Sequence, residues 1–186
     1  SNRERIMNAV TAYQLTSMLQ GVIQRGTAAG RVNLGVPVAG KTGTTNDIKD
    51  VWFVGFTSNI VAGCYIGYDN PRSLGRGESG GGTCAPVFNE FMTHAVAKFG
   101  GGAFNVPPEC QFIKIDRYTG ARLPDDTVNE NAIAECFRAG EEPLHADAFY
   151  LSNDVGGHVL IYASGRVDFI FTNGVALMFY TLHSYL

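Results

Sequence analysis

The sequence of 186 residues has little charge: 17% of its residues are charged, and its formal net charge is −3. This balance gives no electrostatic reason to expect nucleic acid or an anionic membrane as a partner. No apolar run approaches the roughly 20 residues of a membrane span, and Arg3, Glu4 and Arg5 interrupt any signal-peptide pattern. We therefore expect a soluble segment with no membrane contact of its own.

Cysteine is sparse and scattered. Cys64, Cys84, Cys110 and Cys136 form no C-x-x-C pair and have no clustered histidines beside them. A zinc site is therefore not expected, and nothing else in the sequence indicates a metal or a cofactor. The sequence alone does not decide whether Cys110 and Cys136 form a disulfide, and the favoured interpretation is four mostly buried thiols.

Apolar spacing predicts two helices. The first runs over 11–25, with capping-box spacing between Thr11 and Gln14. Its apolar stripe, expected in the core, is Leu15, Met18, Leu19, Val22 and Ile23. The second runs over 85–98, with Pro86 in its first turn and Gly100 after its end. Its expected apolar face is Val87, Phe88, Phe91, Met92, Ala95 and Phe99.

Three strands are expected between these helices. Residues 36–45 are expected to be extended. Pro37 fits an edge strand or the start of a strand, because proline cannot donate to a sheet. Residues 51–57 and 60–68 are predicted as two further strands joined by a tight connection at Ser58-Asn59. Together with the helices they predict an α/β group of the α+β type, an antiparallel sheet flanked by helices.

The rest of the chain changes character. Residues 111–117 favour a short strand, and residues around 130–138 favour a short helix. The strand-like segments of the last part are 158–163, 166–172 and 175–182, and Asn173-Gly174 is a hairpin-turn signal. We divide the chain into a domain over 1–105, an extension over 106–143 and a tail over 144–186 that possesses a candidate β-hairpin.

A string of the P-loop type occurs at Gly35-Val36-Pro37-Val38-Ala39-Gly40-Lys41-Thr42. It matches G-x-x-x-x-G-K-[ST], so a nucleotide-binding protein is one alternative. Such a loop requires an apolar strand before Gly35 and a helix after Thr42. Few large apolar residues precede it, and Pro37 removes one loop amide, so the surroundings argue against this interpretation.

The same residues also fit a functional strand, Lys41-Thr42-Gly43-Thr44-Thr45. In a strand, Thr42 and Thr44 project to one face and Lys41 to the other. Two neighbouring hydroxyls suit a carboxylate, the ammonium adds positive potential, and Gly43 lets a substrate backbone approach. The pentapeptide by itself fits an exposed, solvated strand equally well.

The longer context resembles class A (bifunctional) penicillin-binding proteins, of the serine β-lactamase and transpeptidase superfamily. The similarity includes the Lys41–Thr45 strand and the segments that follow it, at 46–57, 61–63 and 66–69. It also includes the helix and loop before the strand, over 12–28, and the glycine-rich segment that leads into the last helix, over 80–88. The resemblance runs from about residue 5 to residue 99. Residues 106–143 resemble the variable extension after the domain, and residues 144–186 match nothing associated with the family.

Two of the family's motifs are missing. The nucleophilic serine of S-x-x-K and the second motif S-x-N lie upstream of K-T-G in the family, and neither pattern occurs in this sequence. The acyl-enzyme chemistry of an activated serine therefore cannot be assembled from these residues. Of the oxyanion hole, only the backbone N–H of Thr44 is present.

The resemblance implies the C-terminal half of a partial β-lactamase/transpeptidase-like fold, from a peptidoglycan D,D-transpeptidase that is inactive without its nucleophile. It implies catalytic roles for Lys41 and the Thr44 N–H, and substrate binding by Thr42, Gly43, Thr44 and Thr45. It further implies stem-peptide and β-lactam partners, and a membrane-anchored parent at the periplasmic face of the inner membrane. A P-loop protein and a non-catalytic interaction module stay open as alternatives.

Overall fold

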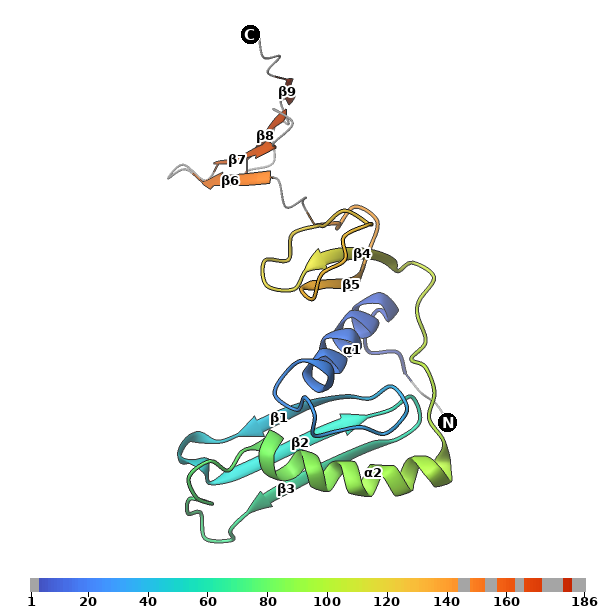
Figure 1. The fold of residues 1–186 in the computed structure, drawn as a ribbon, viewed down its shortest axis with the longest axis vertical. Helices are drawn as coiled ribbons and strands as arrows, with labels where there is room; N and C mark the ends of the chain where they lie inside the picture. The colour runs from blue at the N-terminus through green and yellow to red at the C-terminus, as the bar shows by residue number, and fades with distance from the viewer. Residues whose placement is uncertain (1–3, 144–147, 153–156, 163–165, 172–178, 182–186) are drawn as a thin grey trace. The chain divides into compact units, whose positions relative to one another are not determined.

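The computed structural model describes residues 4–143 together with 148–152, 157–162, 166–171 and 179–181. Contacts divide the chain into two units. The first comprises Ser1–Cys110 and Cys136–Arg138, and the second comprises Gln111–Glu135 and Ala139–Leu186. The candidate site lies in the first unit, an antiparallel sheet with helices α1 and α2 (Figure 1). This arrangement confirms the predicted α+β class.

The sheet of the first unit contains β1 (Ala39–Thr44), β2 (Asp50–Phe56) and β3 (Val61–Gly67) in that order. Both pairs are antiparallel, and Lys41 lies opposite Val54 while Thr44 lies opposite Val51. The three strands agree with the prediction, although β1 begins only after Pro37. Within the described sheet, β1 pairs with β2 alone and lies at the edge, which is one of the two alternatives predicted.

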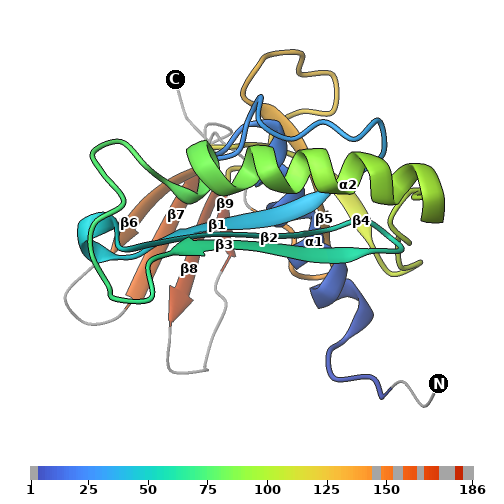
Figure 2. The ribbon, with the colours of Figure 1, turned by 90° about the horizontal axis from the view of Figure 1, so that it is seen from below.

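The core of this unit lies between the sheet and α2 (Ala85–Phe99), which runs along one face of the sheet (Figure 2). Phe53 of β2 and Phe88 of α2 are fully buried, with ring centroids 4.8 Å apart. Gly55 leaves room for the Phe88 ring, because a Cβ there would lie 2.7 Å from Phe88 Cζ. Pro86 in the first turn and Gly100 at the end, with φ of 74°, are as predicted.

The apolar face predicted for α2 is only partly buried. Phe88 and Met92 lie in the core, whereas Val87, Phe91 and Phe99 are exposed. A five-residue π-helical turn, Gly80–Cys84, leads directly into this helix. The turn contacts β1 and β2, and it therefore places the glycine cluster of the sequence beside the K-T-G strand.

Helix α1 (Ala9–Gln24) begins earlier than predicted, and Thr11 is not its cap. Asn8 caps it, because its side-chain oxygen accepts the Val10 N–H at 2.9 Å. The predicted buried stripe is wrong at Leu15 and Met18, which are 47% and 62% exposed. The prediction is confirmed at Ile23, which is buried, and Leu19 and Val22 are half-buried. The helix also buries Val10 and Gly21, which were not in the predicted stripe.

The second unit begins with β4 (Gln111–Asp116), which pairs with β5 (Ala132–Phe137). The strand β4 was predicted, but the helix predicted around 130–138 is wrong. Strand pairing decides this segment, because β-branched Ile133 and aromatic Phe137 suit a sheet once β4 lies beside them. The prediction used only the spacing of apolar residues within 130–138, and this spacing gives no information about the pairing with β4.

A further antiparallel sheet contains β6 (Ala148–Ser152), β7 (Gly157–Tyr162), β8 (Arg166–Phe171) and β9 (Phe179–Thr181). The strands β7 and β8 agree with two of the predicted segments. The predicted turn at Asn173-Gly174 lies outside the described residues.

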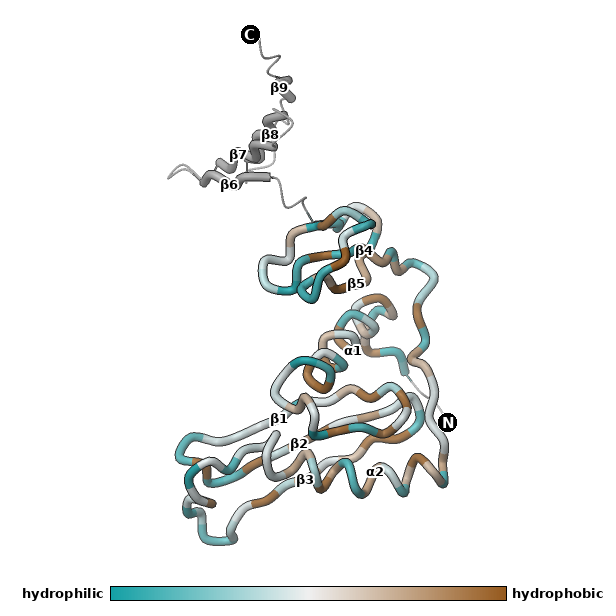
Figure 3. The backbone as a smooth tube through the Cα atoms, viewed as in Figure 1, coloured by the Kyte–Doolittle hydropathy of each residue, from teal (hydrophilic) through white to brown (hydrophobic). Residues whose placement is uncertain are grey.

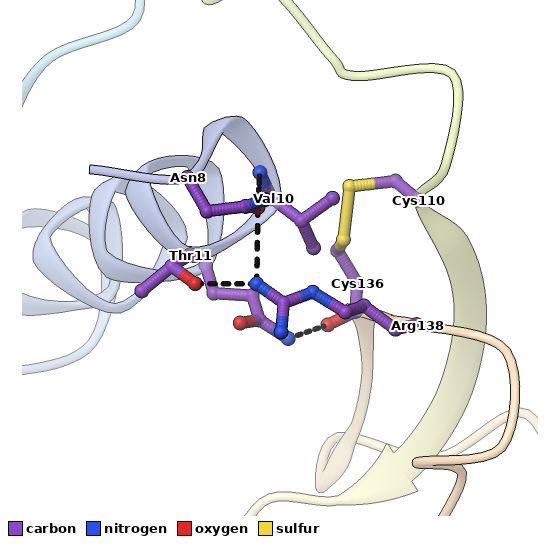
Figure 4. Close-up of a disulfide and its surroundings, with 7 residues drawn as sticks. Asn8, Val10, Thr11, Cys110, Cys136 and Arg138 are labelled. Carbon is purple, nitrogen blue, oxygen red and sulfur yellow. Dashed lines mark hydrogen bonds between the residues drawn. A yellow bond between two sulfur atoms is a disulfide. The ribbon is translucent and has the colours of Figure 1, made fainter. Parts of the chain in front are cut away.

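A disulfide joins Cys110 to Cys136, with a sequence separation of 26, and the favoured interpretation of four thiols is wrong for this pair. Beside it, Arg138 Nη2 donates to Asn8 Oδ1 at 3.0 Å and to Thr11 Oγ1 at 2.6 Å (Figure 4). Gln14 Nε2 donates to the Cys136 carbonyl at 2.9 Å. The disulfide and these bonds hold residues 136–138 against the beginning of α1. Cys64 and Cys84 are free and buried, as expected.

Replacing Cys110 and Cys136 together by serine is expected to lower the free energy of unfolding by about 3 kcal/mol, because closing a loop of this length restricts the unfolded chain. Denaturant titration of the oxidised chain and the variant measures this difference. A reductant should destabilise the parent chain by a similar amount and leave the double variant unchanged. Four free thiols in a thiol titration of the untreated chain would contradict the bridge.

Candidate active site on strand β1

The two faces of β1 carry different chemistry. Lys41 and Gly43 lie opposite Val54 and Trp52, and partners in an antiparallel pair share a face. This face is the one on which Trp52 and Val54 are exposed. Thr42 and Thr44 lie on the other face, toward the turn at Gly80. The strand therefore places Lys41 on one face and Thr42 and Thr44 on the other, as predicted.

The backbone of Thr44 is directed away from the sheet. Thr45 N–H donates to the Asp50 carbonyl at 3.0 Å, so the pair at Thr45 is hydrogen-bonded across to β2. Because such pairs alternate along an antiparallel ladder, Thr44 and Val51 form a non-hydrogen-bonded pair. The N–H and C=O of Thr42 and Thr44 consequently point to the side of β1 where the sheet has no further strand.

The Lys41 ammonium reaches the same edge. Its Nζ donates to the carbonyl of Thr42 at 2.8 Å, and the side chain is exposed. Within the described ranges, no carboxylate lies within ion-pair distance of Lys41. A positive charge beside outward-pointing backbone groups is suited to an extended, negatively charged peptide.

Both threonine hydroxyls have a partner on the strand's inner face. Thr42 Oγ1 and Thr27 Oγ1 are 2.9 Å apart, and Thr27 lies in the loop that follows α1. Thr44 Oγ1 accepts the N–H of Gly80 at 3.1 Å. Sequence reasoning missed Thr27 and Gly80 as site residues. For Thr27, the only signal in the sequence was its short distance from the K-T-G motif. For Gly80, the only signal was its place in a cluster of glycines.

Thr45 has a different environment from the other predicted site residues. Its hydroxyl accepts the Asp50 N–H at 2.9 Å and lies 3.3 Å from the Asp50 carbonyl. These bonds close the turn between β1 and β2. The hydrophilic loops 45–49 and 68–79 surround this end of the sheet (Figure 3). The structure thus brings Lys41, Thr42, Gly43 and Thr44 together, and it gives the Thr45 side chain a place in the turn.

The P-loop interpretation is wrong. Residues 31–38, before Lys41, form no strand, and Lys41 and Thr42 lie inside β1 rather than at the beginning of a helix. Backbone N–H groups on a strand alternate in direction and cannot converge on one phosphate as a P-loop does. Among the described residues, no group of three or more His, Cys, Asp or Glu could hold a metal ion.

The buried Cys84 thiol does not provide a substitute nucleophile. Burial raises the pKa of the Cys84 thiol to about 12, and its hydrogen bond to Cys64 adds to this effect. The thiolate is the reactive form, so Cys84 is inert near neutral pH. None of the helices in the described part of the chain has both the length and the apolar character of a membrane span.

Comparison with known proteins identifies the class. The model of the penicillin binding protein transpeptidase domain matches residues 1–93. Penicillin-binding protein 1A of Rickettsia prowazekii is 44% identical over 164 residues, which is 88% of this chain and 20% of that protein. Penicillin-binding protein 1A of Pseudomonas aeruginosa is 40% identical over 141 residues, 75% of this chain and 17% of that protein.

Comparison with a solved structure gives the same class of protein. The crystal structure of penicillin-binding protein 1A from Haemophilus influenzae matches with a TM-score of 0.62 and 32% identity, covering 76% of this chain and 22% of that chain. The chain therefore belongs to the penicillin-binding protein transpeptidase family, and it is similar to class A members. The chain spans about a fifth of the length of these relatives. These comparisons give no support to a P-loop protein or an unrelated interaction module.

Proposed function

We propose that these residues form one wall of the active site of a peptidoglycan D,D-transpeptidase, an acyltransferase that cross-links the cell wall. The single observation that carries this proposal is the edge of β1. There the Thr44 N–H, the Thr42 carbonyl and the Lys41 ammonium all face a side of the strand without a strand partner. An extended stem peptide fits beside such an edge by strand addition.

Each residue of the strand then has a role. The outward N–H of Thr44 is one half of an oxyanion hole, stabilising the charge that develops on the attacked carbonyl. The hydroxyls of Thr42 and Thr44 donate to the terminal carboxylate of the stem peptide, or to the carboxylate of a β-lactam. Gly43 keeps the strand narrow, and Lys41 supplies positive potential and a place in the site's proton network.

The acyl-enzyme step needs a serine that these residues do not include. S-x-x-K and S-x-N are absent from the sequence, so the nucleophile must come from another part of the transpeptidase domain. The full protein transfers the acyl group of a D-Ala-D-Ala stem peptide to an amine of a neighbouring strand. This fragment by itself is inactive in our proposal.

The compartment we propose is the periplasmic side of the bacterial inner membrane, with an anchor in the parent protein and no membrane contact from this segment. The disulfide between Cys110 and Cys136 supports an oxidising environment. Cytosolic glutathione would keep such a pair reduced, whereas the periplasm allows it to form.

The fragment hypothesis predicts where a penicillin becomes attached. A full-length protein containing this chain should form a stoichiometric acyl adduct with fluorescent penicillin, on the serine of an S-x-x-K motif outside residues 1–186. The isolated chain should stay unlabelled under the same conditions. Peptide mapping by mass spectrometry measures both outcomes. A stoichiometric adduct on any serine of the isolated chain would contradict the assignment.

A further inference from the structure

The π-helical turn that precedes α2 touches the backbone of the K-T-G strand. A Cβ on Gly80 would lie 2.2 Å from the Trp52 carbonyl oxygen and 2.6 Å from the Gly43 carbonyl oxygen. Both separations are shorter than a Cβ can tolerate, and the obstacle is backbone rather than a movable side chain. Glycine is therefore required at position 80 because a side chain there would collide with the backbone of β1 and β2. The backbone conformation is not the reason, because the φ of Gly80 is not in the left-handed region.

This contact determines the direction of one hydrogen bond. Gly80 N–H donates to Thr44 Oγ1 at 3.1 Å and occupies an acceptor lone pair of that hydroxyl. A threonine hydroxyl carries one proton and two lone pairs. The Thr44 proton consequently cannot point at Gly80, and the described part of the chain offers it no other acceptor. Because Thr44 is exposed, its O–H is left to donate to a ligand.

The turn itself is held firmly. Ser79 Oγ accepts the N–H of Gly82 at 2.9 Å, and Thr83 Oγ1 donates to the Glu78 carboxylate. Cys84 Sγ donates to the carbonyl of Val51 at 3.3 Å, which joins the turn to β2. The Gly80 N–H thus belongs to a turn that is held by its own hydrogen bonds and joined to β2 through Cys84.

From these contacts we propose that Gly80 is a positioning residue of the transpeptidase site. Its N–H aligns the Thr44 hydroxyl as a donor to the carboxylate of the stem peptide or β-lactam. Orienting the donor before binding removes the entropy of ordering it in the complex. The inference rests on the proposed function, because it assigns Gly80 a role at the same carboxylate subsite.

Paired substrates test this role in the full-length protein. For a β-lactam and its methyl ester, the ratio of the two acylation rate constants isolates recognition of the carboxylate. Gly80→Ala should lower this ratio by about tenfold, the value of one hydrogen bond to a charged group. Gly82→Ala is the matched control, because its Cβ would meet only the Ser79 Oγ at 3.1 Å, a side-chain atom of the same turn. An unchanged ratio, or an equal loss for both compounds, overturns the proposal.

Amide hydrogen exchange in the 186-residue chain tests the bond without any activity, and without the Gly80→Ala variant. The Gly80 amide should exchange about tenfold faster in Thr44→Val than in the parent chain. Thr44→Ser, which keeps the hydroxyl, should restore slow exchange. Equal exchange in all three chains overturns the positioning role even if Thr44→Val weakens carboxylate recognition. If exchange changes as expected but Thr44→Val leaves the carboxylate-to-ester ratio unchanged, the carboxylate role of Thr44 fails, and the positioning role fails with it.

Discussion

Replacing Thr42 and Thr44 together by valine in the full-length transpeptidase is expected to slow acylation by a carboxylate-bearing β-lactam by about a hundredfold or more. Each hydroxyl bonded to a charged carboxylate contributes about 1.5–3 kcal/mol, and about 1.4 kcal/mol corresponds to a factor of ten. Valine keeps the branched shape of threonine and its preference for strands. Stopped-flow measurement of the second-order acylation rate constant gives the effect.

The methyl ester of the same β-lactam is the control for this double variant. It cannot accept the charge-assisted bonds, so its acylation should change much less than that of the free acid. A second control is Thr45→Val, which removes a hydroxyl bonded to Asp50 in the turn rather than one at the site. Equal slowing of acid and ester would show that the variant disturbs the strand and would remove the carboxylate role from these hydroxyls.

Replacing Phe88 by alanine should lower the free energy of unfolding of the chain by about 3–5 kcal/mol, because it deletes a buried ring and leaves a cavity. Phe88 is 2% exposed and its ring packs against Phe53. Gly55 cannot fill the space, having no side chain, and the sheet cannot move toward α2 without disturbing Phe53. Chemical denaturation of the parent chain and the variant measures the difference.

Phe91→Ala is the matched control on the same helix. Phe91 is 60% exposed, so its loss should change the free energy of unfolding by no more than about 0.5 kcal/mol. Similar losses for both variants would indicate that the face of α2 toward the sheet is not the one that contains Phe88. That result would also contradict the placement of the Gly80–Cys84 turn, since this turn continues directly into α2.

Elements with a strong local signal were predictable from the sequence. The apolar runs over 51–57 and 60–68, joined at Ser58-Asn59, predicted β2 and β3 closely. Pro86 and Gly100 mark the beginning and the end of α2 as expected. Burial of individual residues was less predictable. Leu15 and Phe91 are large and apolar with helical spacing, but spacing shows only which residues share a face. It does not show whether another element covers that face.

The candidate site was predictable in part. Lys41, Thr42, Gly43 and Thr44 follow from the motif, and the alternation of a strand places the two threonines together. Thr27 and Gly80 were missed because they reach β1 from a loop and from a turn far along the chain. The segment 130–138 was misassigned for a related reason, since its partner strand β4 lies outside any local window.

The sequence by itself determined that the chain belongs to this family, that it contains the K-T-G strand, and that it has no S-x-x-K serine. These properties depend only on the order of residues along the chain. The tertiary structure decided which edge of β1 is unpaired, that Gly80 bonds to the Thr44 hydroxyl, and that Cys110 meets Cys136. Each of these depends on contacts between residues distant in sequence, which form only in the folded chain. For Gly80 and Thr44, burial of Phe53 and Phe88 between the sheet and α2 brings the turn and the sheet together.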